Sequence, residues 1–273
     1  MTGAVTPTRP RLVATDLDGT LVRSDRTVSA YTVSVLARLE EAGVPVVFVT
    51  GRPLRWARPV FDYVGSHGLA ILSNGALVWD VHDDVARLER EIAVETALEV
   101  AERIREAVPG SVFAVETARG FALEPGFPRG PILEQSQSPV GRLAELIDAP
   151  VFKLLAKHEE LGPDAFAQAA AAAVADLATV THSTGNVSLL EISAHGVTKA
   201  STLAMVAGEL GIGADEVVAF GDMPNDIAML SWAGTAYAMA DAHPEVLACA
   251  GQVAPGHDDD GVARTLADIF DLG

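Results

Sequence analysis

The chain has 273 residues and is strongly acidic, with a formal net charge of -18 and an isoelectric point of about 4.6. This charge argues against nucleic acid or an anionic membrane as a partner, although a metal and a few basic groups can reverse the field around an anionic substrate. The single cysteine, Cys249, excludes an intramolecular disulfide. We therefore expect a cytoplasmic monomer or weak homodimer with one large or two small domains. The polar segment Met1–Pro10 is typical of a disordered lead-in rather than a signal peptide.

The first predicted strand is an apolar run from Leu12 that ends in Asp16, Asp18 and Gly19. Two aspartates separated by one residue leave an extended strand on the same side, and glycine then allows the backbone to turn. Clustered oxygen ligands suit Mg²⁺, and a carboxylate beside a bound metal can attack phosphorus. An ordinary turn is the alternative, because Asp and Gly are common turn residues.

Helices and strands then alternate, which predicts a right-handed crossover and a parallel sheet: helix 29–43, strand 46–49 and helix 53–64. The strand ends in Thr50 and Gly51. Since ligands bind where parallel strand ends line up, we expect Thr50 to lie near Asp16 and to offer its hydroxyl and adjacent amides to a phosphate oxygen. A simple strand-to-helix turn is the alternative.

Two apolar runs, 69–72 and 76–79, flank the segment Ser73-Asn74-Gly75. Asn-Gly between apolar runs predicts a hairpin with a type I′ turn, which would account for the segment fully. We keep Asn74 as a candidate substrate contact.

From about Asp83 to Ile192 the strict alternation is lost, which predicts an α+β module with a mostly antiparallel sheet. Its expected elements are helix 91–107, strands 112–115 and 120–123, a proline- and glycine-rich loop 126–139, strand 151–156, helix 163–177, and a hairpin of 180–183 and 187–192. Charged residues are mostly exposed, so a solvated surface position is the stronger interpretation for each polar candidate taken alone. These candidates are Arg119, Lys153, Lys157, His182 and Asn186.

The alternation resumes with Lys199 near the start of helix 200–210, where free amides already favour phosphate. Its ammonium would balance the Asp16 carboxylate and a phosphate together, and a surface lysine is the alternative. The apolar strand 217–220 then ends in Asp222, Asn225 and Asp226. A helix cap explains one of these polar residues but does not require three.

These blocks, in this order, resemble the four motifs of the haloacid dehalogenase-like (HAD) superfamily: Asp16-Leu17-Asp18-Gly19-Thr20-Leu21, Thr50-Gly51-Arg52, Lys199, and Gly221-Asp222 with Asn225-Asp226. The insertion between the second and third motifs is similar to that of Cof-type phosphatases with a type IIB cap. The chain differs from the usual motifs at two places. Met223-Pro224 stands where glycine or another small residue is common, and Thr198 stands where serine is common before the lysine. The resemblance implies an α/β fold, with a doubly wound parallel-sheet (Rossmann-like) core of residues 1–82 and 193–273 and an inserted α+β cap of residues 83–192.

The resemblance also implies roles for single residues. Asp16 would attack phosphorus to form an aspartyl-phosphate, and Asp18 would protonate the leaving alcohol and then activate water. The implied ligands of Mg²⁺ are Asp16, the backbone carbonyl of Asp18, Asp222 and, through water, Asp226. The implied phosphate contacts are Thr50, Gly51, Lys199 and Asn225.

The expected function is therefore Mg²⁺-dependent hydrolysis of a small phosphorylated metabolite, such as a sugar phosphate or cofactor phosphate. Asn74, Arg119 and Lys153 are the candidate contacts to the rest of the substrate. Two alternatives remain: a phosphomutase of the same fold, and a catalytically idle regulatory binding protein.

Overall fold

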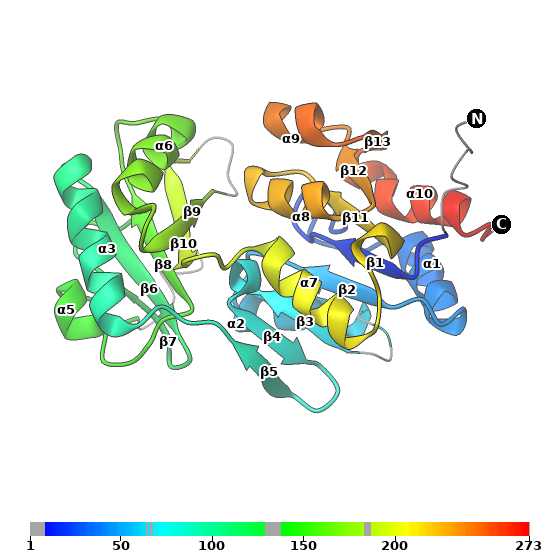
Figure 1. Ribbon diagram of the computed structural model, residues 1–273, viewed down its shortest axis with the longest axis horizontal. Coiled ribbons are helices and arrows are strands. Elements are labelled where there is room, and N and C mark those ends of the chain that lie inside the picture. Colours follow the sequence, from blue (N-terminus) through cyan, green and yellow to red (C-terminus); the bar gives the residue numbers. More distant parts are fainter. Residues whose placement is uncertain (1–8, 64, 66–67, 129–137, 183–186, 273) are drawn as a thin grey trace.

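The computed structural model describes residues 9–63, 65, 68–128, 138–182 and 187–272, which form two sheets with their own helices, side by side in Figure 1. Predictions for the first eight residues of the lead-in, for positions 129–137 of the loop and for Asn186 lie outside these ranges. Within the described ranges, no helix combines the length and the apolar character needed to span a membrane.

The larger sheet has eight strands, drawn from the first and last parts of the described chain. In spatial order they are β13 (Gln252–Ala254), β12 (Thr235–Met239), β11 (Val217–Gly221), β1 (Leu12–Thr15), β2 (Val46–Val49), β3 (Leu69–Leu72), β4 (Leu77–Asp80) and β5 (Val85–Glu89). The six strands from β13 to β3 are parallel, whereas β4 and β5 are antiparallel additions. All residues of β1 and β2 are buried, as expected for central strands of a parallel sheet covered on both faces.

Two helix pairs pack with this sheet and close its core: α1 (Ala30–Glu41) against α10 (Gly261–Ile269), and α7 (Lys199–Glu209) against α8 (Ile227–Trp232). The shorter helix α9 (Pro244–Cys249) lies next to α8. The Ser29 hydroxyl caps α1 by accepting from the amide of Thr32 at 3.0 Å, as predicted for that helix start. The α/β core with a parallel sheet is therefore confirmed.

The smaller sheet has five antiparallel strands, in the order β7 (Gly120–Leu123), β6 (Val112–Thr117), β8 (Lys153–Lys157), β10 (Leu189–Ala194) and β9 (Ala178–Thr181). Helices α3 (Val94–Ala107) and α6 (Pro163–Val174) cover one face and share a second hydrophobic core with it. The short helix α5 (Leu143–Leu146) lies beside β7. The other face points toward the larger sheet and carries a different set of side chains, described below.

The sheets differ from the predicted module limits of 83 and 192 at both ends. β5 pairs with β4 in the larger sheet, and β10 continues to Ala194 in the smaller one. The residues of β5 are mostly exposed, so their sequence lacks the apolar pattern that predicts a strand of a buried sheet. We propose that the cap comprises about residues 90–194.

Two local predictions were wrong. The helix expected over 53–64 is a single turn, α2 (Leu54–Ala57), followed by a 3-10 helix, η1 (Arg58–Tyr63), since Pro59 cannot donate an amide hydrogen bond. The strands β3 and β4 do form a hairpin, but four residues connect them instead of a two-residue type I′ turn. Ser73, Asn74 and Gly75 all have positive φ (49°, 58° and 104°). This tight path brings Gly75 against the Thr198 carbonyl, 2.4 Å from where a Cβ would lie.

Candidate active site

The candidate site lies where three adjacent parallel strands end. β1 has β11 on one side and β2 on the other, so residues after all three strands emerge at one edge of the sheet. Asp16 and Asp18 follow β1, Thr50 follows β2, and Asp222 follows β11. The structure thus brings together the polar residues that the sequence placed at strand ends.

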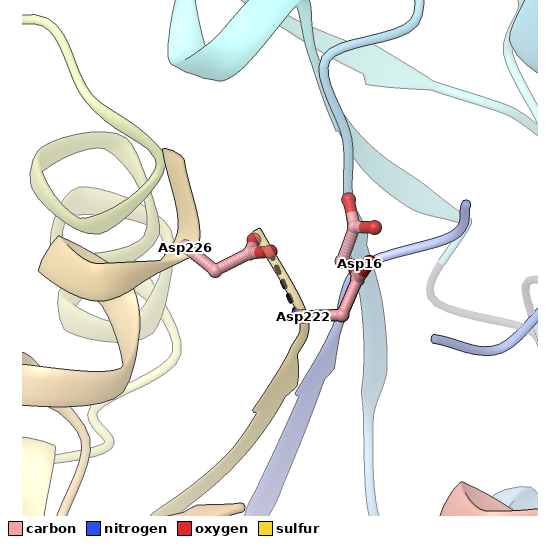
Figure 2. A group of neighbouring side chains, drawn as sticks. All are labelled: Asp16, Asp222 and Asp226. Atoms are coloured by element: carbon pink, nitrogen blue, oxygen red, sulfur yellow. Dashed lines mark hydrogen bonds between the residues drawn. The ribbon is translucent and has the colours of Figure 1, made fainter. Parts of the chain in front are cut away.

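Three carboxylates converge at this edge. Asp16, Asp222 and Asp226 each offer an oxygen within 4.8 Å of the others, and Figure 2 shows them gathered around one small volume. Asp16 is 5% exposed and Asp226 is fully buried. Such a group of buried oxygens needs positive charge nearby, because desolvated like charges repel strongly.

Lys199 supplies part of that charge. It is the first residue of α7, where Thr198 and Ser201 form a capping box, and it is 1% exposed. Its Nζ donates to Asp16 Oδ1 at 2.5 Å and to Asp226 Oδ1 at 2.7 Å. Burial alone would lower the pKa of Lys199, but Asp16 and Asp226 raise it above its ordinary value, so the side chain is a permanent cation. The surface interpretation of Lys199 was therefore wrong.

One cation does not neutralise the cluster. Burial raises the pKa of Asp16 well above its ordinary value, opposed by Lys199 and reinforced by the neighbouring carboxylates. Burial and the nearby Asp226 raise the pKa of Asp222 to about 7, opposed by a hydrogen bond from the Thr20 hydroxyl. Both shifts mark a site that is short of positive charge in the absence of a further cation.

Asp226 organises the loop after β11. Its Oδ2 accepts hydrogen bonds from the backbone amides of Asp222 and Met223, both at 3.1 Å, the first of which is drawn in Figure 2. Its Oδ1 accepts from Lys199. Both carboxylate oxygens of Asp226 therefore already accept hydrogen bonds from the protein.

Two glycines let the carboxylates approach the backbone. A Cβ at Gly19 would lie 2.3 Å from Asp222 Oδ2, and Gly19 has a φ of +77° that favours glycine in any case. A Cβ at Gly221 would lie 2.5 Å from the Asp226 Cβ. The first glycine was predicted to make a turn, but its contact with Asp222 was not.

Asp18 has a partner that the sequence analysis did not assign. Arg52 Nε donates to Asp18 Oδ2 at 2.7 Å and Arg52 Nη2 donates to Asp18 Oδ1 at 2.5 Å. The only signal in the sequence was the position of Arg52 directly after Thr50-Gly51. The Arg52 guanidinium thus pairs with both carboxylate oxygens of Asp18.

The expected phosphate contacts surround the same edge. Thr50 is 1% exposed, and its Oγ1 accepts from the Arg52 amide at 3.1 Å, which leaves the hydroxyl hydrogen available to a ligand. Asn225 donates from Nδ2 to Asn74 Oδ1 at 3.0 Å and retains its second Nδ2 hydrogen, while its Oδ1 is buried without a partner among the described residues.

A cavity of about 1120 Å³ extends from Asp16 and Asp18 to the open face of the cap sheet. Lys153 lines the cavity and is 3% exposed, so the interpretation of Lys153 as a solvated surface residue was wrong. Lys153 Nζ donates to Glu191 Oε1 at 2.5 Å and to the Gly51 carbonyl at 2.6 Å, while Asn74 Nδ2 donates to Glu191 Oε2 at 3.1 Å. These contacts join the cap to the core directly beside the site. Glu191 was missed, although it is a lone acid in an apolar strand.

The other cap candidates are placed differently. Arg119 lies in the turn between β6 and β7, pairs with Asp148 and has a side chain that is 71% exposed. It does not line the cavity. His182 is buried and pairs with Asp164, whereas Lys157 does line the cavity.

A profile described as haloacid dehalogenase-like hydrolase matches residues 13–266, so the chain belongs to this family. In enzyme class it is a hydrolase of phosphoric monoesters. It is 26% identical to a 5-amino-6-(5-phospho-D-ribitylamino)uracil phosphatase, YitU of Bacillus subtilis, over 97% of this chain and 99% of that protein. It is 28% identical to the pyridoxal phosphate phosphatase YbhA of Escherichia coli, over 94% of this chain and 97% of that protein.

The fold also matches a solved structure described as the HAD subclass IIB sugar phosphatase BT4131, with a TM-score of 0.77 and 19% identity. That likeness covers 96% of this chain and 100% of the other. At this identity it supports the fold, core and cap together, and the substrate must be argued from this chain's own residues.

Proposed function

We propose that this protein is a Mg²⁺-dependent phosphatase that hydrolyses a small phosphorylated metabolite through an aspartyl-phosphate on Asp16. The observation that carries the proposal is the position of Asp16: buried at the end of β1, 2.5 Å from the Lys199 ammonium and open to a cavity large enough for a small substrate. A carboxylate held in this way can attack a phosphorus atom brought to the same point.

The donor set fits a hard divalent cation. Asp16 and Asp222 offer carboxylate oxygens, Asp18 would add its backbone carbonyl two residues after Asp16, and Asp226 would act through water. Oxygen-only ligands of this kind suit Mg²⁺. When bound, the ion would supply the positive charge that neutralises the incoming phosphate and lets two anions meet.

Asp16 Oδ would form the new bond to phosphorus as the bond from phosphorus to the leaving oxygen breaks. Asp18 would give a proton to that oxygen and then take one from the water that cleaves the aspartyl-phosphate. Lys199, the Thr50 hydroxyl and the free Asn225 hydrogen would hold the phosphoryl oxygens as charge develops.

The cap would exclude water and select the substrate. Its contacts with Gly51 and Asn74 close the cavity over the reacting residues. The relatives named above are phosphatases for a ribitylaminouracil phosphate and for pyridoxal phosphate. Their different substrates support small phosphorylated metabolites as the class for this chain.

The test is release of inorganic phosphate from a panel of phosphomonoesters, with Mg²⁺ and after exhaustive chelation. We expect turnover that requires Mg²⁺ and disappears in a folded Asp16→Asn variant. Conversion of a hexose phosphate to its isomer without phosphate release would favour the mutase alternative. Tight binding of esters without either reaction would favour the idle binding protein.

A further inference from the structure

The cavity-facing side of the cap sheet is divided into a charged part and an apolar part. Side chains alternate across a strand, so in β8 Leu154 and Ala156 enter the cap core while Lys153, Leu155 and Lys157 face the cavity. The charged part, beside the core, is Glu116, Lys153 and Glu191. The apolar part is Phe121, Phe127, Leu155 and Leu189, which group together apart from the main cap core.

The larger domain adds a second apolar surface to the same cavity. Trp56, Pro59, Val60 and Tyr63 of α2 and η1 line it from the core side. Trp56 is 39% exposed, so its indole is available to a ligand. The Arg55 guanidinium lies 4.9 Å from the Trp56 ring and 5.6 Å from the Phe121 ring, which places core and cap aromatics at the same end of the cavity.

The charged groups of the cavity are largely occupied by one another. Arg52 pairs with Asp18, Arg55 with Glu116, and Lys153 with Glu191. Among the cations that line the cavity, Arg26 and Lys157 have no ion pair within the described residues. A sugar would bring several hydroxyls that lose water on entry, and most of the charged groups that the described lining offers them already pair with one another.

We infer that the leaving group is an alcohol attached to a planar heteroaromatic ring. The ring would lie between Trp56 and the leucines Leu155 and Leu189 of the cap sheet, beside the Arg55 guanidinium that contacts Trp56 and Phe121. Its phosphate would lie at Asp16, and a ring acceptor would be directed to Lys157. Aromatic faces pack well against aromatic and aliphatic side chains, and a ring needs few hydrogen bonds. This inference makes the proposed function more specific. Its kinetic test requires the phosphatase activity proposed above, whereas its binding test does not.

The test compares kcat/KM for pyridoxamine phosphate, which has no aldehyde to react with lysine, with that for glucose 6-phosphate and glycerol phosphate. We expect the aromatic ester to be preferred over glucose 6-phosphate by at least about 10-fold, which corresponds to roughly 1.4 kcal/mol. Trp56→Ala should lower kcat/KM for the aromatic ester by about 2- to 12-fold, mainly through KM, and leave glycerol phosphate unchanged. Tyr31→Ala, which removes an exposed aromatic outside the cavity, is the matched control.

Binding to Asp16→Asn by calorimetry gives a second readout that does not need turnover. Tighter binding of pyridoxamine phosphate than of glucose 6-phosphate, weakened by Trp56→Ala and by Lys157→Met, supports the inference even if every ester resists hydrolysis. Equal or tighter binding and turnover of glucose 6-phosphate would overturn it while leaving the phosphatase proposal intact. A uniform effect of Trp56→Ala on all three esters would also overturn it.

Discussion

Replacing Lys153 with methionine tests whether the buried cluster of Lys153 and Glu191, which contacts Gly51 and Asn74 of the core, holds the cap on the core. The two side chains are 4% and 9% exposed, and Lys153 also donates to the Gly51 carbonyl. Removing one partner of a buried ion pair costs about 3–5 kcal/mol, because the remaining charge stays buried after losing that partner. Glu191 would still accept the 3.1 Å hydrogen bond from Asn74, but would lose the ammonium of Lys153.

The cost should appear in cap closure rather than in global unfolding, since separation of the cap would let water reach Glu191. A loss of about 3–5 kcal/mol corresponds to a decrease of about 100- to 4,000-fold in the equilibrium constant for cap closure. We expect kcat/KM of Lys153→Met to fall toward this limit for every ester, with a much smaller change in the free energy of unfolding. The measurements are steady-state kinetics and chemical denaturation on the same preparations.

The second variant is Lys153→Met combined with Glu191→Gln, which removes both charges and keeps an acceptor for Asn74. It should recover more than half of the lost free energy, because the double variant no longer buries the Glu191 charge. Lys157→Met, on the same strand and face but without an ion pair among the described residues, is the control, assayed with glycerol phosphate because that ester has no ring for Lys157 to contact. A single variant as active as the wild type, or a double variant as impaired as the single one, would refute the reasoning.

Further predictions concern the core site. Asp18→Asn should lower kcat by about 10²–10⁴-fold, more for an alkyl ester than for p-nitrophenyl phosphate, and equal losses would contradict its role as the acid. Gly19→Ala should weaken both activity and Mg²⁺ affinity, because the added Cβ would clash with Asp222. Gly43→Ala is the control: its φ of +71° is similar but its surroundings are open, so it should cost only about 1–2 kcal/mol of stability. Equal effects of the two variants on activity and Mg²⁺ affinity would exclude the clash. The folded pKa of Asp222 is raised to about 7, so the metal-free folded state holds a proton that the unfolded chain releases, and stability should fall as the pH rises through about 4–7. Mg²⁺ should therefore raise Tm more at pH 8 than at pH 5, and the same shift at both pH values would count against this carboxylate as a ligand.

The sequence was sufficient to predict that the polar residues of the site meet at one edge of the sheet. Apolar strands that end in Asp16, Thr50 and Asp222 could be recognised locally, and parallel strand ends align by geometry. Lys199 was placed correctly because its helix start follows the cap, although its burial between two carboxylates depends on packing. These elements carry their own local signals.

The cap contacts could not be predicted in the same way. Lys153 and Glu191 are 38 residues apart, and they meet only because β8 and β10 pair antiparallel in one register and the cap docks on Gly51 and Asn74. Arg119 had the same charge but lies in an exposed turn. A charged residue does not reveal from its own neighbours which face of a sheet it will occupy.

The central claim is that Asp16 becomes phosphorylated during turnover. The most direct measurement is rapid acid quench of the enzyme during turnover of an ester with radiolabelled phosphate, followed by peptide mapping. We predict an acid-stable, alkali-labile acyl phosphate on the peptide containing Asp16, formed at least as fast as the steady-state rate and absent from Asp16→Asn. Rapid hydrolysis with no labelled protein at any quench time, or label on another residue, would contradict the account.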